Sequence, residues 1–253
     1  MVVSNRPGAN NFVSNNGGRA DLFLSDPVRI PTNTHNHSVK VTKASIWYNF
    51  PNITETNNLF SFSYNGATFN LYLPIGLYNV IDINNTISRS LSNLNDPSIS
   101  STFIQLQPNY STSRVMITFE KAGTTFNASE PFSIGSILGI PTPITSAFDG
   151  QVLTGINIAT INTVNQIYIH STIAGANGVR IDGDSGQVVA SVPISSSPGT
   201  QILYQPFIPD VVPINSVSGQ SISRISTWIT DENNNILNTF GEKWEVTMLV
   251  TYF

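Results

Sequence analysis

The stretch SISRISTWITDENNNILNTFGEKWEVTMLVTYF, residues 221–253, predicts two β-strands joined by a polar turn. Apolar side chains occupy every second position of its last run: Trp244, Val246, Met248, Val250 and Tyr252. A period of two is that of a pleated strand, and the Asp and Asn residues at 231–235 favour a turn. A final strand is normally paired with a neighbour, so we expect the upstream chain to build the sheets that receive it.

The composition favours a protein that is largely covered by partners. The chain has 253 residues, enough for one large β domain or two smaller ones. Only 10% of the residues are charged, compared with about a quarter in typical globular proteins. A neutral polar surface suits a protein covered by copies of itself or by partners, because burying unpaired charge is costly. A secreted or adhesive β protein fits the same composition.

Charge and residue usage argue against several other classes. The net charge is −4 and there is no basic run, so we expect no nucleic-acid binding. The chain has no cysteine, which excludes a disulfide framework and a Cys-ligated metal. We also predict no signal peptide and no membrane span, because the first 16 residues lack a basic and then apolar region and no run of 18 apolar residues occurs.

Residues 59–140 predict a separate unit of order β-β-α-β-β that ends in a short helical turn at 131–140. Asn65-Gly66 is a hairpin signal, since both residues tolerate positive φ. A helix is predicted from apolar residues spaced three or four apart: Val80, Ile83, Ile87, Leu91 and Leu94. Asn79 is its expected N-cap, Asp82 lies in its first turn, and Asn-Asp-Pro at 95–97 ends it.

The flanking segments differ in character. Residues 1–34 are rich in Gly, Asn and Pro and predict an extended arm, which either reaches a neighbouring subunit or is a loose terminus. Residues 39–50 predict the first strand, with Val39, Val41 and Trp47 on one side, and Pro51 stops it. From residue 164 onward, strands broken by turns indicate a sandwich.

The metal signals are weak. His35-Asn36-His37 would put two rings on one face of a strand, but no Cys and no evident third ligand accompany it, and His170 is the third histidine. The turn Asp182-Gly183-Asp184-Ser185-Gly186 has two carboxylates, yet Ca²⁺ needs six or more oxygens and Gln187 follows instead of an acid. We therefore predict solvent or interface histidines, a hairpin turn, and no metal or cofactor.

No catalytic residue is predicted. A Gly-x-Ser-x-Gly motif is missing, and Gly135 and Gly139 lack the lysine of a phosphate loop. Three tryptophans could stack on sugars, but their place in alternating strands favours core packing: Trp47, Trp228 and Trp244.

Three segments of the sequence resemble small capsid proteins of double-stranded DNA viruses. The closing pair, with its turn at 231–235 and its Gly241-Glu242 step, resembles their C-terminal strand pair. LYLPIGLYNVIDINNTI and PFSIGSILGIP resemble further segments of the same proteins. The relatives are the single jelly-roll penton and minor capsid proteins of virophages and polinton-like viruses, akin to adenovirus penton base. The resemblance covers residues 59–140 and 202–253.

The resemblance implies a mainly β protein, a single jelly-roll β-sandwich that carries an inserted small α+β domain. It places an extended arm at 1–38, the jelly roll at 39–50 and 150–253, and a β-β-α-β-β insert at 51–149. The implied role is a pentameric vertex (penton) capsomer of an icosahedral virion, a homo-oligomer beside major capsid proteins and not an enzyme. A host receptor or fibre is a further implied partner, although Gly18-Arg19-Ala20-Asp21 is not an Arg-Gly-Asp motif.

Two other classes stay open. A trimeric virion spike, fibre head or carbohydrate-binding module would need an exposed aromatic cluster; the candidates are Tyr64, Tyr72, Tyr78 and Phe148. A glycosidase would need two carboxylates in a cleft; the available groups are Asp182, Asp184, Asp210 and Glu242.

Overall fold

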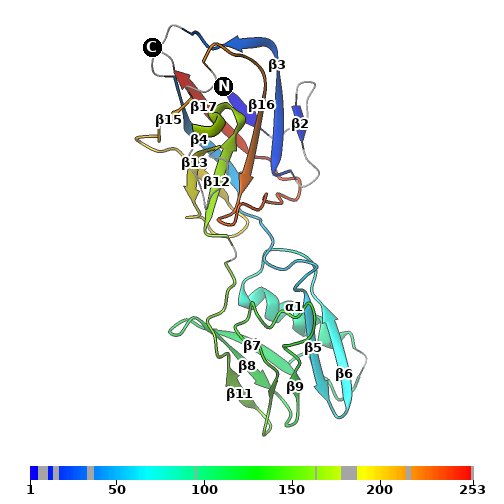
Figure 1. Ribbon diagram of the computed structural model, residues 1–253. Coiled ribbons are helices and arrows are strands. Elements are labelled where there is room, and N and C mark those ends of the chain that lie inside the picture. The colour runs from blue at the N-terminus through cyan, green and yellow to red at the C-terminus, as the bar shows by residue number, and fades with distance from the viewer. Residues whose placement is uncertain are drawn as a thin grey trace. The chain divides into compact units, whose positions relative to one another are not determined.

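The chain forms two compact units (Figure 1). One contains Met1–Phe50 and Val164–Phe253, and the other contains Pro51–Thr163. The structure, a computed structural model, describes residues 1–4, 11–13, 17–32, 37–94, 96–162, 164–177, 187–214 and 218–251.

The first unit contains two antiparallel sheets. One sheet has the strand order β1-β17-β4-β14, with β15 also paired to β4. Its strands are β1 (Val2–Ser4), β17 (Glu245–Thr251), β4 (Ser38–Trp47), β14 (Gln201–Tyr204) and β15 (Val212–Pro213). The other sheet has the order β13-β12-β16-β3-β2. Its strands are β13 (Val188–Pro193), β12 (Gln166–Ser171), β16 (Ser221–Thr230), β3 (Arg19–Arg29) and β2 (Asn11–Val13); a 3-10 helix, η1, spans Thr172–Asn177.

Eight of these strands follow the order of a jelly roll. In chain order they are β1, β3, β4, β12, β13, β14, β16 and β17. One sheet then holds the first, eighth, third and sixth strands, and the other holds the second, seventh, fourth and fifth. Each sheet thus alternates strands from the two ends of the chain, as the two Greek keys of a jelly roll require. The predicted fold class, a mainly β jelly roll with an inserted α+β unit, is confirmed.

The closing strand pair receives the neighbours that the sequence predicts. β17 pairs with β4 on one side and β1 on the other, so it lies inside its sheet. Trp244, Val246 and Met248 are buried, and Leu249 points to solvent. Trp244 also donates a hydrogen bond from Nε1 to the Gly17 carbonyl oxygen at 2.8 Å, which ties the closing strand to the start of β3.

The prediction of an unpacked N-terminal arm is wrong for the described parts of residues 1–38. β1 pairs with β17, and β3 pairs with β16 over most of its length. These two strands are the first and second of the jelly roll. Both strands contain short apolar runs, Val2-Val3 and Leu22-Phe23-Leu24, but these lie within a segment rich in Gly, Asn and Pro that favours an extended arm. Their pairing partners lie more than 190 residues along the chain, which no local pattern displays. The charges of β3 are balanced across the sheet, where Asp21 pairs with Arg224 of β16.

The predicted faces of β4 are wrong beyond Val41 because the strand contains a β-bulge. Thr247 of β17 faces Lys43 and Met248 faces Val41, so Thr42 is the extra residue. The bulge reverses the alternation, because one added residue moves every following side chain to the other face. Val39 and Val41 are buried, as are Ala44 and Ile46 beyond the bulge, whereas Trp47 lies at the surface.

The inserted unit joins β4 to β12 and contains one helix and two small sheets (Figure 1). The sheets have the orders β10-β9-β5-β6 and β11-β8-β7. Their strands are β5 (Leu59–Tyr64), β6 (Ala67–Tyr72), β7 (Ile104–Asn109), β8 (Arg114–Phe119), β9 (Thr125–Phe126), β10 (Ile144–Thr145) and β11 (Gln151–Thr154), and the helix is α1 (Val80–Ser92). The unit extends beyond residue 149, the expected end of the insert, because β11 pairs with β8.

The local predictions for this unit are confirmed at the hairpin and the helix. Asn65 and Gly66 have φ of 49° and 80° in the turn between β5 and β6. Asn79 and Asp82 form a capping box: the Asp82 amide donates to Asn79 Oδ1 at 2.9 Å, and the Asn79 amide donates to Asp82 Oδ2 at 3.2 Å. Residues 131–140, expected to form a short helical turn, fold as successive turns without a helix.

Candidate functional site

The most exposed apolar segment of the first unit follows β14. Phe207 is 99% exposed, and three neighbours are also largely exposed: Leu203, Ile208 and Val211. Pro206 and Pro209 flank the Phe207-Ile208 pair and restrict its backbone, which lowers the entropy lost when the segment is ordered by a partner. We call residues 203–211, the last two residues of β14 and the segment after them, the apolar loop. Its composition suits contact with another protein surface.

A cavity of about 410 Å³ adjoins this loop on β4, β14 and the start of β17. It is lined by Lys43, Ser45, Trp47, Gln201, Leu203, Glu242, Lys243, Trp244 and Glu245. The structure therefore brings together two residues that the sequence offered separately, Trp47 for sugar stacking and Glu242 as a glycosidase carboxylate. Two lysines and two glutamates balance the charge of the lining, so the cavity has no electrostatic preference for an anion or a cation.

A row of aromatic and charged side chains crosses the sheet β13-β12-β16-β3-β2, on the face opposite the buried Ile225 and Ile229. We call it the ladder; its members are His170, Trp228, Arg19, Asp21 and Arg224. The His170 ring stacks on Trp228 with centroids 5.1 Å apart, and the Arg19 guanidinium lies 5.5 Å from the Trp228 ring centroid. Trp228 is half-buried within this ladder. Core packing, the prediction for all three tryptophans, therefore holds for Trp244 alone.

Asp21 is the charged centre of the ladder. Its carboxylate lies 2.6 Å from Arg224 Nη2 and 3.5 Å from Arg19 Nε, and its side chain is only 5% exposed. Desolvation raises the pKa of Asp21, but the hydrogen bonds from Ser226 and Arg224 and the positive charges of Arg19 and Arg224 outweigh it, so the pKa lies below its usual value. This ion-pair cluster joins β3 to β16 and is a structural feature of the sheet.

The inserted unit has a second cavity, of about 530 Å³. One wall is the tip of the β7–β8 hairpin, the other is the segment after β11, and Val80 at the start of α1 completes it. The lining residues are Val80, Pro108, Asn109, Tyr110, Ser113, Arg114, Val115, Ile158, Ala159, Thr160, Ile161 and Asn162. The lining thus combines polar and apolar side chains, as small-molecule sites do.

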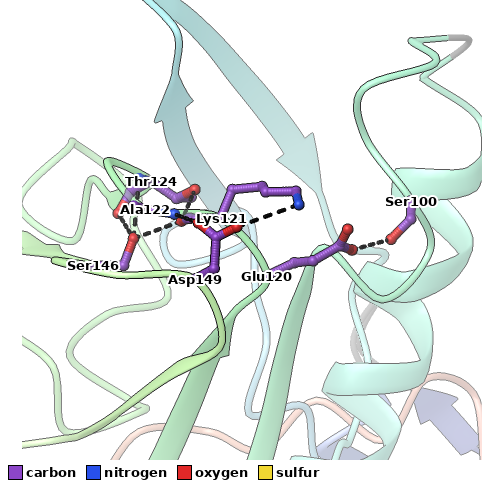
Figure 2. Close-up of polar contacts among 7 residues, drawn as sticks. All are labelled: Ser100, Glu120, Lys121, Ala122, Thr124, Ser146 and Asp149. Carbon is purple, nitrogen blue, oxygen red and sulfur yellow. Dashed lines mark hydrogen bonds and ion pairs between the residues drawn. The ribbon is translucent and has the colours of Figure 1, made fainter.

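A polar network fixes the loop between β8 and β9 (Figure 2). The Ser146 hydroxyl donates to the Lys121 carbonyl at 2.7 Å, and Asp149 accepts from the Ala122 amide at 2.8 Å and pairs with Lys121 Nζ at 3.4 Å. The Ala122 hydrogen bond lowers the pKa of Asp149, and Lys121 adds to this. These groups hydrogen-bond to each other and to backbone, so we assign them to loop structure.

The proposed metal signals find no support in the part of the chain that is described. His37 is buried and its Nε2 donates to the Pro31 carbonyl at 2.9 Å. His35 and the Asp182–Gly186 turn lie outside the described residues. Among residues that are described, no group of three or more His, Cys, Asp or Glu side chains is placed to hold a metal ion. No helix in the described ranges is long and apolar enough to span a membrane.

The exposed aromatic residues differ in part from those that the sequence offered. Tyr72 and Phe148 are exposed, whereas Tyr64 and Tyr78 are half-buried. Two further exposed aromatic residues were not among those candidates. Tyr110 is 82% exposed and lines the cavity of the inserted unit, and Phe207 lies in the apolar loop. The residue types of Pro108-Asn109 before Tyr110, which favour the end of a strand and a turn, and the prolines around Phe207 were the available signals.

Comparison with known proteins gives a likeness of fold to a solved structure and no match in sequence. No protein-family model and no curated protein sequence matches the chain. Its fold is similar to that in the crystal structure of the mavirus penton protein, with a TM-score of 0.50 and 12% identity. The similarity covers 100% of this chain and 99% of that one. It therefore concerns both the jelly roll and the inserted unit, and it is a likeness of fold.

Proposed function

We propose that this chain is a structural capsid protein and that five copies form the vertex capsomer of an icosahedral double-stranded DNA virus. One observation carries the proposal: an eight-stranded jelly roll interrupted by an α+β unit, similar in fold to a penton protein over its whole length. In this proposal the jelly-roll unit forms the shell in the virion, and the inserted unit is exposed on the outside. Major capsid proteins are the expected neighbours, and no catalytic role is assigned.

A five-membered ring needs two different complementary faces on each subunit, because an isologous contact closes a dimer. The apolar loop supports the first of these faces. Burying one exposed phenylalanine contributes about 1.5–3 kcal/mol, and Phe207 exposes its side chain almost entirely. We propose that this loop contacts the adjacent subunit of the ring.

The low charge of the chain supports the same assembly. Since only 10% of its residues are charged, large areas can be buried in contacts without desolvating unpaired ions. Ring formation should therefore depend weakly on salt concentration, because surface ion pairs are what salt screens.

The decisive experiment is native mass spectrometry of the full chain over a range of concentrations. We expect a species of five times 27.5 kDa. Phe207→Ser should shift the mass toward the monomer without changing the circular dichroism spectrum. Phe148→Ser, which changes an exposed aromatic residue of the inserted unit, is the matched control and should leave the ring intact.

Other masses would decide against this proposal. A trimer would favour a spike or fibre head. A chain that stays monomeric at the highest concentration would contradict ring assembly by this protein alone.

A further inference from the structure

The cavity of the inserted unit offers a set of groups that together select a ligand class. Tyr110 is one of its lining residues and is 82% exposed, so its ring is available to a ligand. Four amide and hydroxyl side chains line the same cavity: Asn109, Asn162, Ser113 and Thr160. Amides and hydroxyls both donate and accept hydrogen bonds, so this lining matches a ligand with many hydroxyl groups. An aromatic ring beside such groups matches the apolar face of a sugar ring.

The charge of the lining narrows the class further. Arg114 is the one charged residue among the lining groups, and no Asp or Glu accompanies it. Within the described part of the chain Arg114 has no ion-pair partner, and it is exposed. A guanidinium binds a carboxylate through two parallel hydrogen bonds, so the cavity favours an anionic ligand.

The walls of the cavity are held in place before any ligand binds. The Ala159 amide donates to the Ser113 carbonyl at 2.9 Å, and the Thr160 amide donates to the Ile137 carbonyl at 2.8 Å. Asn52 Nδ2 donates to the Ile161 carbonyl, also at 2.8 Å. The first bond fixes the segment after β11 against the hairpin tip, and the other two anchor it to the rest of the unit. This order reduces the entropy that a ligand would have to offset.

We propose that this cavity binds a saccharide residue that carries a carboxylate, with Tyr110 under the sugar ring and Arg114 on the carboxylate. The volume of about 530 Å³ falls within the range of about 300–1,000 Å³ for small-molecule sites. The proposal goes beyond the capsid role, because assembly requires no ligand. It gives the inserted unit a specific partner, an acidic glycan.

Two matched pairs of sugars test the proposal on the full chain by saturation-transfer NMR and titration calorimetry. Methyl β-D-glucuronide is compared with methyl β-D-glucoside, and 3′-sialyllactose with lactose. We expect at least one acidic sugar to bind at least tenfold more tightly than its neutral match. Arg114→Gln should remove this preference, and Tyr110→Ala should weaken binding of the acidic sugar at least tenfold.

The control variant is Lys121→Gln, which removes a cation of the same unit outside the cavity lining and should leave binding unchanged. The proposal is overturned if neither acidic sugar binds better than its neutral match, or if Arg114→Gln retains the preference while its circular dichroism spectrum is native. The measured mass keeps the two proposals separate. A pentamer that binds no acidic sugar overturns only the glycan site, and a monomer that binds one overturns only the ring.

Discussion

Replacing Asp21 by asparagine should destabilise the jelly-roll unit at neutral pH. Removing one member of a buried ion pair costs about 3–5 kcal/mol, and the Asp21 side chain is 5% exposed between two arginines. The side chains of Arg19 and Arg224 are 40% and 51% exposed, so water can hydrate them once the carboxylate is gone. We therefore expect a loss of about 1–2 kcal/mol.

The pH dependence of this loss has a definite sign. The pKa of Asp21 is lower in the folded state than in the unfolded chain. Its contribution is therefore complete above the unfolded value of about 3.9 and disappears as pH falls through the folded value. The difference in unfolding free energy between the wild type and Asp21→Asn should be constant from pH 7 to pH 5 and should shrink toward pH 3.

Urea denaturation followed by tryptophan fluorescence measures this directly. All three tryptophans, Trp47, Trp228 and Trp244, belong to the jelly-roll unit, so their emission reports its unfolding. Asp26→Asn is the control, because Asp26 lies in the same strand as Asp21, in the unit that the tryptophans report, but is exposed, and its midpoint should match the wild type. The reasoning is refuted if the two variants behave alike, or if the effect of Asp21→Asn is as large at pH 3 as at pH 7.

Three further predictions concern the inserted unit. Phe60→Ala should destabilise it by about 3–5 kcal/mol, because Phe60 is fully buried and stacks on Phe126 at 4.7 Å; urea denaturation followed at the helix circular dichroism band measures this. Asn79→Ala should cost about 1 kcal/mol in the same assay through loss of the capping box, and no change would contradict the cap. Gly66→Ala should cost about 1–2 kcal/mol, because φ is +80° there, and an equally stable variant would show that the turn relaxes.

Local patterns account for the elements that the sequence predicted correctly. The alternation of Trp244, Val246 and Met248, the spacing of Ile83 and Ile87, and the turn at Asn65-Gly66 are each set by residues close in the chain. Burial of one face, capping and positive φ act over a few residues, so a sequence displays them. The fold class also followed, because the resemblance of the closing strand pair and of the inserted segments pointed to a jelly roll.

The elements that were missed depend on partners far along the chain. β3 has only a short apolar run, Leu22-Phe23-Leu24, and it pairs with β16, which supplies backbone hydrogen bonds and the Arg224 charge that balances Asp21. The bulge at Thr42 exists only in the pairing with β17, and it moves Trp47 to the surface.

The sequence by itself determined the strands with a buried face, the capped helix and the turns, because these are decided by neighbouring residues. Tertiary structure alone decided that parts of the N-terminal region become strands, where the insert ends and which side chains share a cavity. Tyr110 and Ile158 meet across one cavity only after β11 has paired with β8, and the physical reason is that such contacts arise from strand pairing between distant segments, which no local pattern encodes.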